Sequence, residues 1–227
     1  MMLKITDLYD LTHTLAAGYL SGFQYPWEAL AGLSDFILAL GSTLDMDEYC
    51  HPLDWDGKEL TDVWVARDAT VYKTAYLHGP CIIGHGTEVR PSAFVRGSAL
   101  VGDNCVVGNS TELKNVILFD NVQVPHYNYV GDSILGYKAH MGAGSITSNV
   151  KSDKALVVVK SADEAVETGQ KKVGAMLGDR VEVGCNSVLN PGTVLGRDVS
   201  VYPTSCVRGV IPEGHIYKDK DHILPRT

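Results

Sequence analysis

The feature that most constrains the fold of this chain is a six-residue repeat of branched aliphatic residues. A period of six fits neither an α-helix nor an extended antiparallel ladder. It predicts a coil with three flat sides, in which each side is a short strand with one inward aliphatic residue, followed by a tight turn. The repeat positions are Leu77, Ile83, Val89, Val95, Val101, Val107 and Leu113, and then Leu177, Val183, Leu189, Leu195, Val201 and Val207.

The repeat also predicts how the coils assemble. One coil cannot bury its own aliphatic side chains, so successive coils are expected to stack around one continuous core. From Val65 to Val207 there are about twenty-one hexads, which make roughly seven coils of three hexads each. Between the two regular blocks the aliphatic positions slip by one residue, as at Leu118 and again at Leu135. We therefore expect an all-β, parallel β-helix.

Two segments fall outside the repeat. Residues 6–41 have a helical pattern: Leu8, Leu11, Leu15 and Tyr19 share one helix face, and a second helix is expected to begin at Pro26 and end before Gly41. Residues 150–176 interrupt the hexads and predict an arm, with a hairpin as one possible form, that projects from the coils.

The expected organisation is therefore an N-terminal helical segment (1–60), a β-helix (61–212) with an inserted arm (150–176), and a C-terminal tail (213–227).

Composition excludes some classes of function. A net charge of −8 disfavours general binding to a nucleic acid backbone, so any anion site must be a local cluster of cations. Five cysteines without a C-x-x-C motif disfavour a disulfide framework or a zinc knuckle. No leader opens the sequence, and no apolar run approaches the ~18 residues of a membrane span. We expect no membrane partner and a cytoplasmic location.

Two cations are expected to stack in neighbouring coils. Arg96 and Lys114 each follow a repeat position, and these positions are three hexads apart, which is one coil. Adjacent strands lie ~4.8 Å apart, so the two charges repel unless an anion lies between them or solvent screens them. Solvent exposure and a bound phosphorylated ligand are both open on this spacing. His126, two faces beyond Lys114, favours the ligand.

Three segments carry a resemblance to a known family. "GNSTELKNVIL", "VPHYNYVGDSILG" and "GAGSITSNV" resemble the acetyltransferase domain of bifunctional sugar-1-phosphate nucleotidylyltransferase/acetyltransferases. This family includes the bacterial N-acetylglucosamine-1-phosphate uridyltransferase and its archaeal relatives, and the likeness covers residues 65–212. It implies a left-handed helix. "YPWEAL" (25–30) resembles the family's junction between its two domains, but the Gly-rich nucleotide loop is absent, so we expect no nucleotidyl transfer.

The resemblance also implies residue roles. His126 is the expected general base, because a neutral imidazole is available near neutral pH. Arg90 is the rival of Arg96 for the phosphate contact, and His140 stands where bacterial members have an asparagine. The expected substrate-binding residues are Arg96, Lys114, Tyr129, His140, Asn149 and Lys154, and Ala143 and Cys185 are expected to meet the cofactor.

The expected activity is transfer of an acetyl group from acetyl-CoA, as co-substrate and without a metal, to an amino-sugar phosphate such as glucosamine-1-phosphate. A homotrimer is expected, because family sites lie between neighbouring β-helices and a three-sided prism packs around a threefold axis. O-acetylation of a sugar hydroxyl and a non-catalytic scaffold or regulatory subunit remain alternatives. A γ-class carbonic anhydrase is disfavoured, because the eight histidines include no His-x-x-x-x-His.

Overall fold

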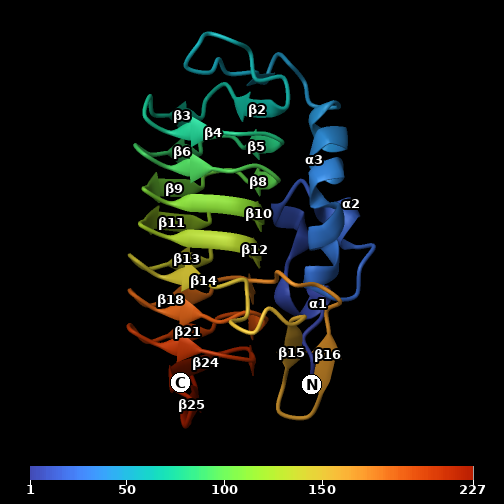
Figure 1. Ribbon diagram of the computed structural model, residues 1–227, viewed down its shortest axis with the longest axis vertical. Coiled ribbons are helices and arrows are strands. Elements are labelled where there is room, and N and C mark those ends of the chain that lie inside the picture. The colour runs from blue at the N-terminus through green and yellow to red at the C-terminus, as the bar shows by residue number, and fades with distance from the viewer. Residues whose placement is uncertain (227) are drawn as a thin grey trace.

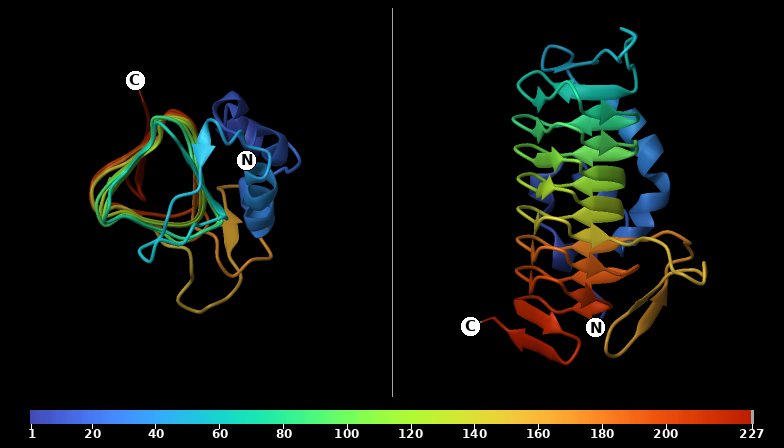
Figure 2. Two further views of the ribbon diagram at one scale, coloured as in Figure 1. Left: turned by 90° about the horizontal axis from the view of Figure 1, so that it is seen from above. Right: turned by 60° about the vertical axis from the view of Figure 1, so that its left-hand side comes forward.

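The computed structural model describes residues 1–226 and shows a left-handed parallel β-helix with a helical segment along one side (Figure 1). Seen along its axis the β-helix is a triangle, so it has three flat faces (Figure 2). The predicted fold class is confirmed.

Strands of successive coils stack on each face. Face one contains β2 (Val63–Ala66), β5 (Cys81–Ile83), β8 (Ala99–Val101), the second halves of β10 (Glu112–Leu118) and β12 (Tyr129–Leu135), β17 (Ala175–Leu177), β20 (Thr193–Leu195) and β23 (Val210–Ile211). Face two contains β3 (Thr70–Val71), β6 (Glu88–Val89), β9 (Val106–Asn109), β11 (Gln123–His126), β13 (His140–Met141), β18 (Glu182–Val183), β21 (Ser200–Val201) and β24 (His215–Asp219). Face three contains β4 (Tyr76–Leu77), β7 (Phe94–Val95), the first halves of β10 and β12, β14 (Ile146–Thr147), β19 (Val188–Leu189) and β22 (Cys206–Val207).

The number of coils agrees with the repeat. Between Val63 and Val207 each face carries seven strands, the number predicted from the hexads. Beyond Val207, β23 adds to face one and β24 adds to face two, where it pairs in parallel with β21. Residues 213–227, expected to be a tail, thus include one more strand of the stack and β25 (His222–Pro225), which pairs antiparallel with β24.

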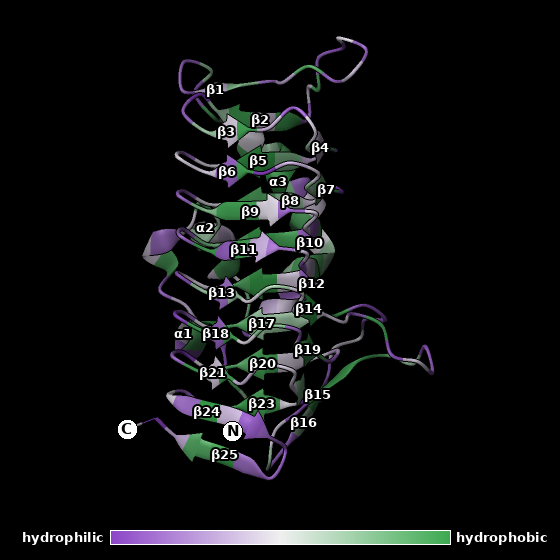
Figure 3. Ribbon diagram, turned by 90° about the vertical axis from the view of Figure 1, so that its left-hand side faces the viewer, coloured by the Kyte–Doolittle hydropathy of each residue, from purple (hydrophilic) through white to green (hydrophobic). Residues whose placement is uncertain are grey.

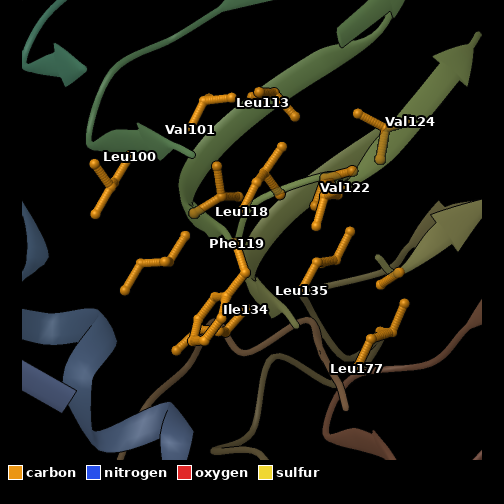
Figure 4. Packing of buried hydrophobic residues seen from close by; sticks show 14 of the residues in the cluster. Leu100, Val101, Leu113, Leu118, Phe119, Val122, Val124, Ile134, Leu135 and Leu177 are labelled. Carbon is orange, nitrogen blue, oxygen red and sulfur yellow. The ribbon is translucent and has the colours of Figure 1, made fainter. Parts of the chain in front are cut away.

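Inward aliphatic residues fill the core. Leu113, Leu118, Val124, Leu135 and Leu177 have no exposed surface and point into the prism from its three faces (Figure 4). Burial of a leucine or valine side chain contributes about 1.5–3 kcal/mol. Strands such as β9, β12 and β20 are largely hydrophobic, and the turns that join the strands carry hydrophilic residues (Figure 3).

The slip in the repeat marks a change of coil length. Ile83 pairs with Val101, a full three hexads later. Val101 pairs with Leu118 and Leu118 with Leu135, and each of these steps is one residue short of three hexads. The missing residue lies at the corner between faces three and one. There β10 and β12 each continue around the corner as one unbroken strand.

The N-terminal segment covers face one (Figure 2). It contains α1 (Ile5–Leu8), η1 (Leu11–His13), α2 (Ala17–Leu20), η2 (Pro26–Gly32) and α3 (Leu33–Gly41). The backbone amides of Asp120 and Asp179, at the edge of face one, donate hydrogen bonds to the carbonyls of His13 and Leu8, each at 3.0 Å. These bonds attach the segment to the coils.

The prediction of one continuous helix before Pro26 is wrong. The pattern of Leu8, Leu11, Leu15 and Tyr19 predicted a single helix, but the structure has three short helical turns, and Leu15 is 47% exposed. The Asp10 side chain accepts a hydrogen bond from the Thr12 amide at 3.1 Å. Such local side-chain bonds compete with a continuous helix. The predicted start at Pro26 is confirmed, and helical structure continues through Gly41.

The arm leaves the coils after Asn149 and contains an antiparallel hairpin of β15 (Val158–Lys160) and β16 (Ala165–Glu167), which projects beside the coils (Figure 1). The arm is also attached to the N-terminal segment. Gln170 Nε2 donates to the Trp27 carbonyl at 2.7 Å, and the Met1 ammonium lies 2.9 Å from the Asp163 carboxylate.

Candidate active site

A column of four residues follows the corner between faces two and three. Asn109, His126, Ala143 and Cys185 occupy this position in successive coils, about 4.8 Å apart. The carbonyls of Asn109, His126 and Ala143 each accept a backbone hydrogen bond from the following coil, at 3.0, 3.0 and 2.9 Å. The structure therefore brings the expected base and the two expected cofactor-binding residues together, and we call this set the histidine column.

His126 is exposed at the end of β11. Its Nδ1 lies 3.3 Å from Oδ1 of Asn109, which can only accept a hydrogen bond. When Nδ1 donates in this contact, Nε2 is the nitrogen that can accept a proton from a substrate. The His126 amide donates to Oδ1 of the buried Asn128 at 3.1 Å, and Asn128 Nδ2 donates to the carbonyls of Gly142 and Ser145. The turn that carries the imidazole is therefore fixed.

A second cluster lies at the other edge of face three, around a buried carboxylate. Asp132 is 3% exposed, and its Oδ1 accepts hydrogen bonds from Lys114 Nζ at 2.8 Å and Asn115 Nδ2 at 2.9 Å. Its Oδ2 accepts one from Asn149 Nδ2 at 2.5 Å. Three donors satisfy the buried charge. We call Lys114, Asn115, Asp132 and Asn149 the aspartate cluster.

Tyr129 joins the aspartate cluster to the middle of face three. Asn149 Nδ2 lies 3.1 Å from the Tyr129 hydroxyl. Burial raises the pKa of the Tyr129 hydroxyl, and the hydrogen bond from Asn149 only partly offsets this effect. The phenol therefore keeps its proton at neutral pH and has a hydrogen to donate outward.

The predicted stacking of Arg96 and Lys114 is confirmed. Val95 pairs with Leu113, so the two cations that follow these residues lie in adjacent coils. Each cation has its own carboxylate: Arg96 lies 2.7 Å from Glu112, which raises the pKa of the guanidinium, and Lys114 lies 2.8 Å from Asp132. The rival residue, Arg90, pairs with Glu88 at 3.0 Å after β6, on face two.

The histidine column and the aspartate cluster lie at opposite edges of face three. Asn109, beside His126, and Lys114 belong to the same coil and are five residues apart, which is about 17 Å along an extended chain. Tyr129 lies between the two edges on the neighbouring coil. Together these residues outline a strip across face three, rather than one tight group of contacting side chains.

Two expected substrate-binding residues lie away from this strip. His140 is on β13 of face two, where its Nδ1 lies 2.7 Å from the Glu182 carboxylate. Lys154 is exposed on the arm, directly after the ion pair of Lys151 with Asp153. A ligand bound along the strip of this chain would therefore not lie next to either side chain.

Sequence reasoning did not assign Asp132, Asn115 or Asn109. The feature of the sequence that could have identified these residues is their spacing. Asn115, Asp132 and Asn149 recur at a constant interval that is one residue short of three hexads, and Asn109, His126 and Ala143 recur at the same interval. This interval is the length of the shortened coils, so each set was bound to form a column.

Two absences hold for residues 1–226. In this part of the chain no three His, Cys, Asp or Glu side chains are grouped to hold a metal ion. Within the same residues, no helix has the length and apolar character needed to cross a membrane.

The fold and the repeat define the hexapeptide-repeat, left-handed β-helix class. Residues 77–220 match the family model described as the GMPPB C-terminal domain, and the chain belongs to this family. The resemblance to the acetyltransferase domain of the bifunctional sugar-1-phosphate enzymes is confirmed.

Several curated proteins are similar to the chain. The bifunctional protein GlmU of Methanococcus maripaludis is 29% identical over 98% of this chain and 53% of its own length. The bifunctional sugar-1-phosphate nucleotidylyltransferase/acetyltransferase of Sulfurisphaera tokodaii is 30% identical over 69% of this chain and 39% of its own length. The chain thus spans about half the length, or less, of the curated relatives it matches.

Among solved structures, a variant of perosamine N-acetyltransferase from Caulobacter crescentus, in complex with CoA and GDP-perosamine, covers 71% of this chain and 54% of its own. The sequence identity is 16% and the TM-score is 0.35, values too low to assign a substrate.

Proposed function

We propose that this chain is an acetyl-CoA-dependent acetyltransferase that acetylates the amino group of an amino-sugar phosphate such as glucosamine-1-phosphate. The observation that carries the proposal is the placement of a histidine with a free Nε2 and a buried-carboxylate cation cluster at the two edges of one face. The confirmed family resemblance supports the same chemistry, since the matched relatives include proteins named as acetyltransferases.

His126 would act as the general base. Nε2 takes a proton from the sugar amine as the amine nitrogen attacks the thioester carbon of acetyl-CoA. The new C–N bond forms, the C–S bond breaks, and coenzyme A leaves as the thiol after it gains a proton. Backbone amides of the histidine column near Ala143 and Cys185 would stabilise the carbonyl oxygen in the transition state.

Lys114 and Arg96 would bind the sugar phosphate. Asp132 is buried and saturated, so Lys114 keeps this partner and offers its remaining N–H groups to a ligand. The Arg96–Glu112 pair is partly exposed, with side chains 47% and 31% exposed, and such pairs are weak. A phosphate can therefore replace Glu112 on the guanidinium at little cost.

We also propose that the chain works as a homotrimer. The N-terminal segment already covers face one, whereas face three presents an outward row that includes Tyr76, Phe94, Tyr129 and Ile146. Tyr76 and Phe94 are 45% and 39% exposed. A second copy packed on face three would cover these rings and enclose the strip.

A thiol-release assay with acetyl-CoA tests the activity. The acceptors are hexosamine phosphates, the same hexosamines without phosphate, and hexose phosphates that offer only hydroxyls. Release of coenzyme A with the first group alone supports the proposal, and release with hexose phosphates shows O-acetylation instead. No release with any acceptor, from protein with an intact fold, contradicts it.

A further inference from the structure

A cavity of about 570 Å³ lies between the arm and the last coils, away from both clusters on face three. One wall is formed by Val158, Lys160, Ser161 and Ala162 of the arm. The other wall is the corner between faces three and one in the last two coils, residues 191–192 and 208–211. Lys151 and Ile223 complete the lining, and we call this space the arm pocket.

The arm packs directly on the coils at the base of the arm pocket. Gly192 and Gly209 have φ of +77° and +79°, a conformation that favours glycine. A Cβ on Gly209 would lie 2.8 Å from the Lys160 carbonyl, and one on Gly192 would lie 2.9 Å from Cγ1 of Val157. The two walls therefore lie in close contact at Gly192 and Gly209, which leave no room for a side chain at the base of the arm pocket.

The arm pocket is positively charged although the chain is acidic. Its lining contains Lys151, Lys160 and Arg208 and no aspartate or glutamate, in a chain of net charge −8. Lys151 pairs with Asp153 at 3.1 Å. Lys160 and Arg208 form no ion pair with any residue in the described range 1–226. Two cations thus face a cavity without a carboxylate partner.

The two acidic residues that follow this wall in sequence, Asp163 and Glu164, contact the N-terminus of the chain. Asp163 lies 2.9 Å from the Met1 ammonium, and the Glu164 carboxylate accepts a hydrogen bond from the Met2 amide. Both acidic side chains at the tip of the arm therefore face the N-terminal segment. Lys160 and Arg208 are therefore not paired with Asp163 or Glu164.

We propose that the arm pocket binds a phosphate-bearing small molecule with an apolar part next to the phosphate. Lys160 and Arg208 would hold the phosphate oxygens by charge-assisted hydrogen bonds. Val158, Val210 and Ile211 line the same cavity and would contact the apolar part.

The arm pocket is separate from the Lys114 contact proposed for a sugar phosphate. Four strand spacings, through β12, β14, β19 and β22, separate Lys114 from the coil position of Arg208, which is about 19 Å. One phosphate group cannot reach both residues.

Calorimetric titration with inorganic pyrophosphate, ADP and coenzyme A tests the proposal. The variants are Lys160→Gln, Arg208→Gln and the double variant, and Lys58→Gln, an exposed lysine outside the arm pocket, is the matched control. Both target side chains are exposed, so circular dichroism should show an unchanged fold. We expect pyrophosphate to bind the wild type, each single variant to weaken binding about tenfold, and the double variant about a hundredfold. The control should bind like the wild type.

Pyrophosphate and coenzyme A together distinguish the sources of the phosphate. If coenzyme A is the ligand, it displaces pyrophosphate and the double variant weakens its binding too. If another phosphorylated molecule is the ligand, coenzyme A binds the double variant as it binds the wild type. No binding of any probe at about 1 mM, or an unchanged dissociation constant in the double variant, overturns the proposal. Titration of His126→Ala separates this outcome from failure of the acetyl-transfer proposal, since that variant retains the arm pocket.

Discussion

The ammonium of Lys114 lies 2.8 Å from the carboxylate of Asp132, which is almost completely buried and also accepts hydrogen bonds from Asn115 and Asn149. This contact joins two successive coils at the corner where each has lost one residue. A solvent-exposed lysine would have little preferred direction. Here a buried partner fixes the direction of the ammonium, so the coils themselves orient the cation toward face three.

Asp132→Asn should therefore destabilise the protein. The change keeps the shape of the side chain but removes its charge. It also replaces one accepting oxygen with an NH₂ group that faces other donors. The free energy of unfolding should therefore fall by about 2 kcal/mol. Urea unfolding measures this loss. The control is Glu112→Gln, which removes the carboxylate of the exposed pair with Arg96 and should cost less than about 1 kcal/mol. Equal losses in the two variants would contradict the distinction.

His126→Ala should reduce kcat by about 10²–10⁴ without unfolding the protein, because general-base catalysis contributes this much and the side chain is exposed. Steady-state kinetics with the accepted hexosamine phosphate measures the effect. His222→Ala, at an exposed histidine in the C-terminal hairpin, is the control. Full kcat in His126→Ala would remove His126 from the chemistry.

Lys114→Gln should raise KM for a phosphorylated acceptor about tenfold or more and change kcat less, since a charge-assisted phosphate contact is lost. The same variant assayed with the unphosphorylated hexosamine should show no such increase, which gives an internal control. Asn149→Ala should lower kcat/KM without abolishing turnover. If Lys114→Gln affects both acceptors equally, the phosphate is not its partner.

Stability should depend on pH through Asp120, at the edge of face one. Burial raises the pKa of the Asp120 carboxyl, and the hydrogen bond from the Asp103 amide only partly offsets this. A carboxyl whose pKa is higher in the folded state stabilises the fold while it is protonated, and this stabilisation is lost as pH rises through the folded pKa. Asp120→Asn should thus be more stable than the wild type at neutral pH, with a smaller difference near pH 4. Urea unfolding between these values measures the trend.

The carboxyl of Asp198 should affect the pH dependence of stability in the opposite direction to that of Asp120. Its hydrogen bonds with Arg180 lower the pKa of the Asp198 carboxyl, so its stabilisation is present above the unfolded pKa and disappears as pH falls. Asp198→Asn should be less stable than the wild type at neutral pH and should approach it at acidic pH. If Asp120→Asn and Asp198→Asn change the free energy of unfolding in the same direction at neutral pH, these two carboxyls do not control the pH dependence of stability.

Sedimentation velocity should show a trimer at micromolar concentration. Phe94→Glu places a charge in the exposed row of face three and should shift the protein toward monomer. Glu182→Lys, on face two, is a control for a change of surface charge. A monomeric wild type would leave face three uncovered and contradict the proposed assembly.

The hexad was enough to predict the coils, their number between Val63 and Val207 and the stacking of Arg96 on Lys114, because a period of six leaves one way to bury every aliphatic residue. It could not predict that each cation pairs with a carboxylate. The pairing of Lys114 depends on the shortened corner, where Asp132 has a positive φ and its carboxylate turns toward the ammonium of the coil before it.

Two other features of the N-terminal segment were also beyond the sequence pattern. The helical pattern before Pro26 was misleading because Asp10 caps the start of η1 and the Thr14 hydroxyl accepts a hydrogen bond from the Ala16 amide before α2, so each turn begins anew. The contact of Met1 with Asp163 joins exposed residues from distant parts of the chain, and no periodicity encodes it.

The arm is inserted without disturbing the register of the coils. Leu135 pairs with Leu177 although the whole arm lies between them in sequence, and the ladder then continues with Leu195 after a coil of ordinary length. The register of the ladder is therefore set by the coils on either side of the arm, while Val157, Val159 and Val173 of the arm pack into the same core. The arm thus adds a projecting wall to the molecule without removing a strand from the stack.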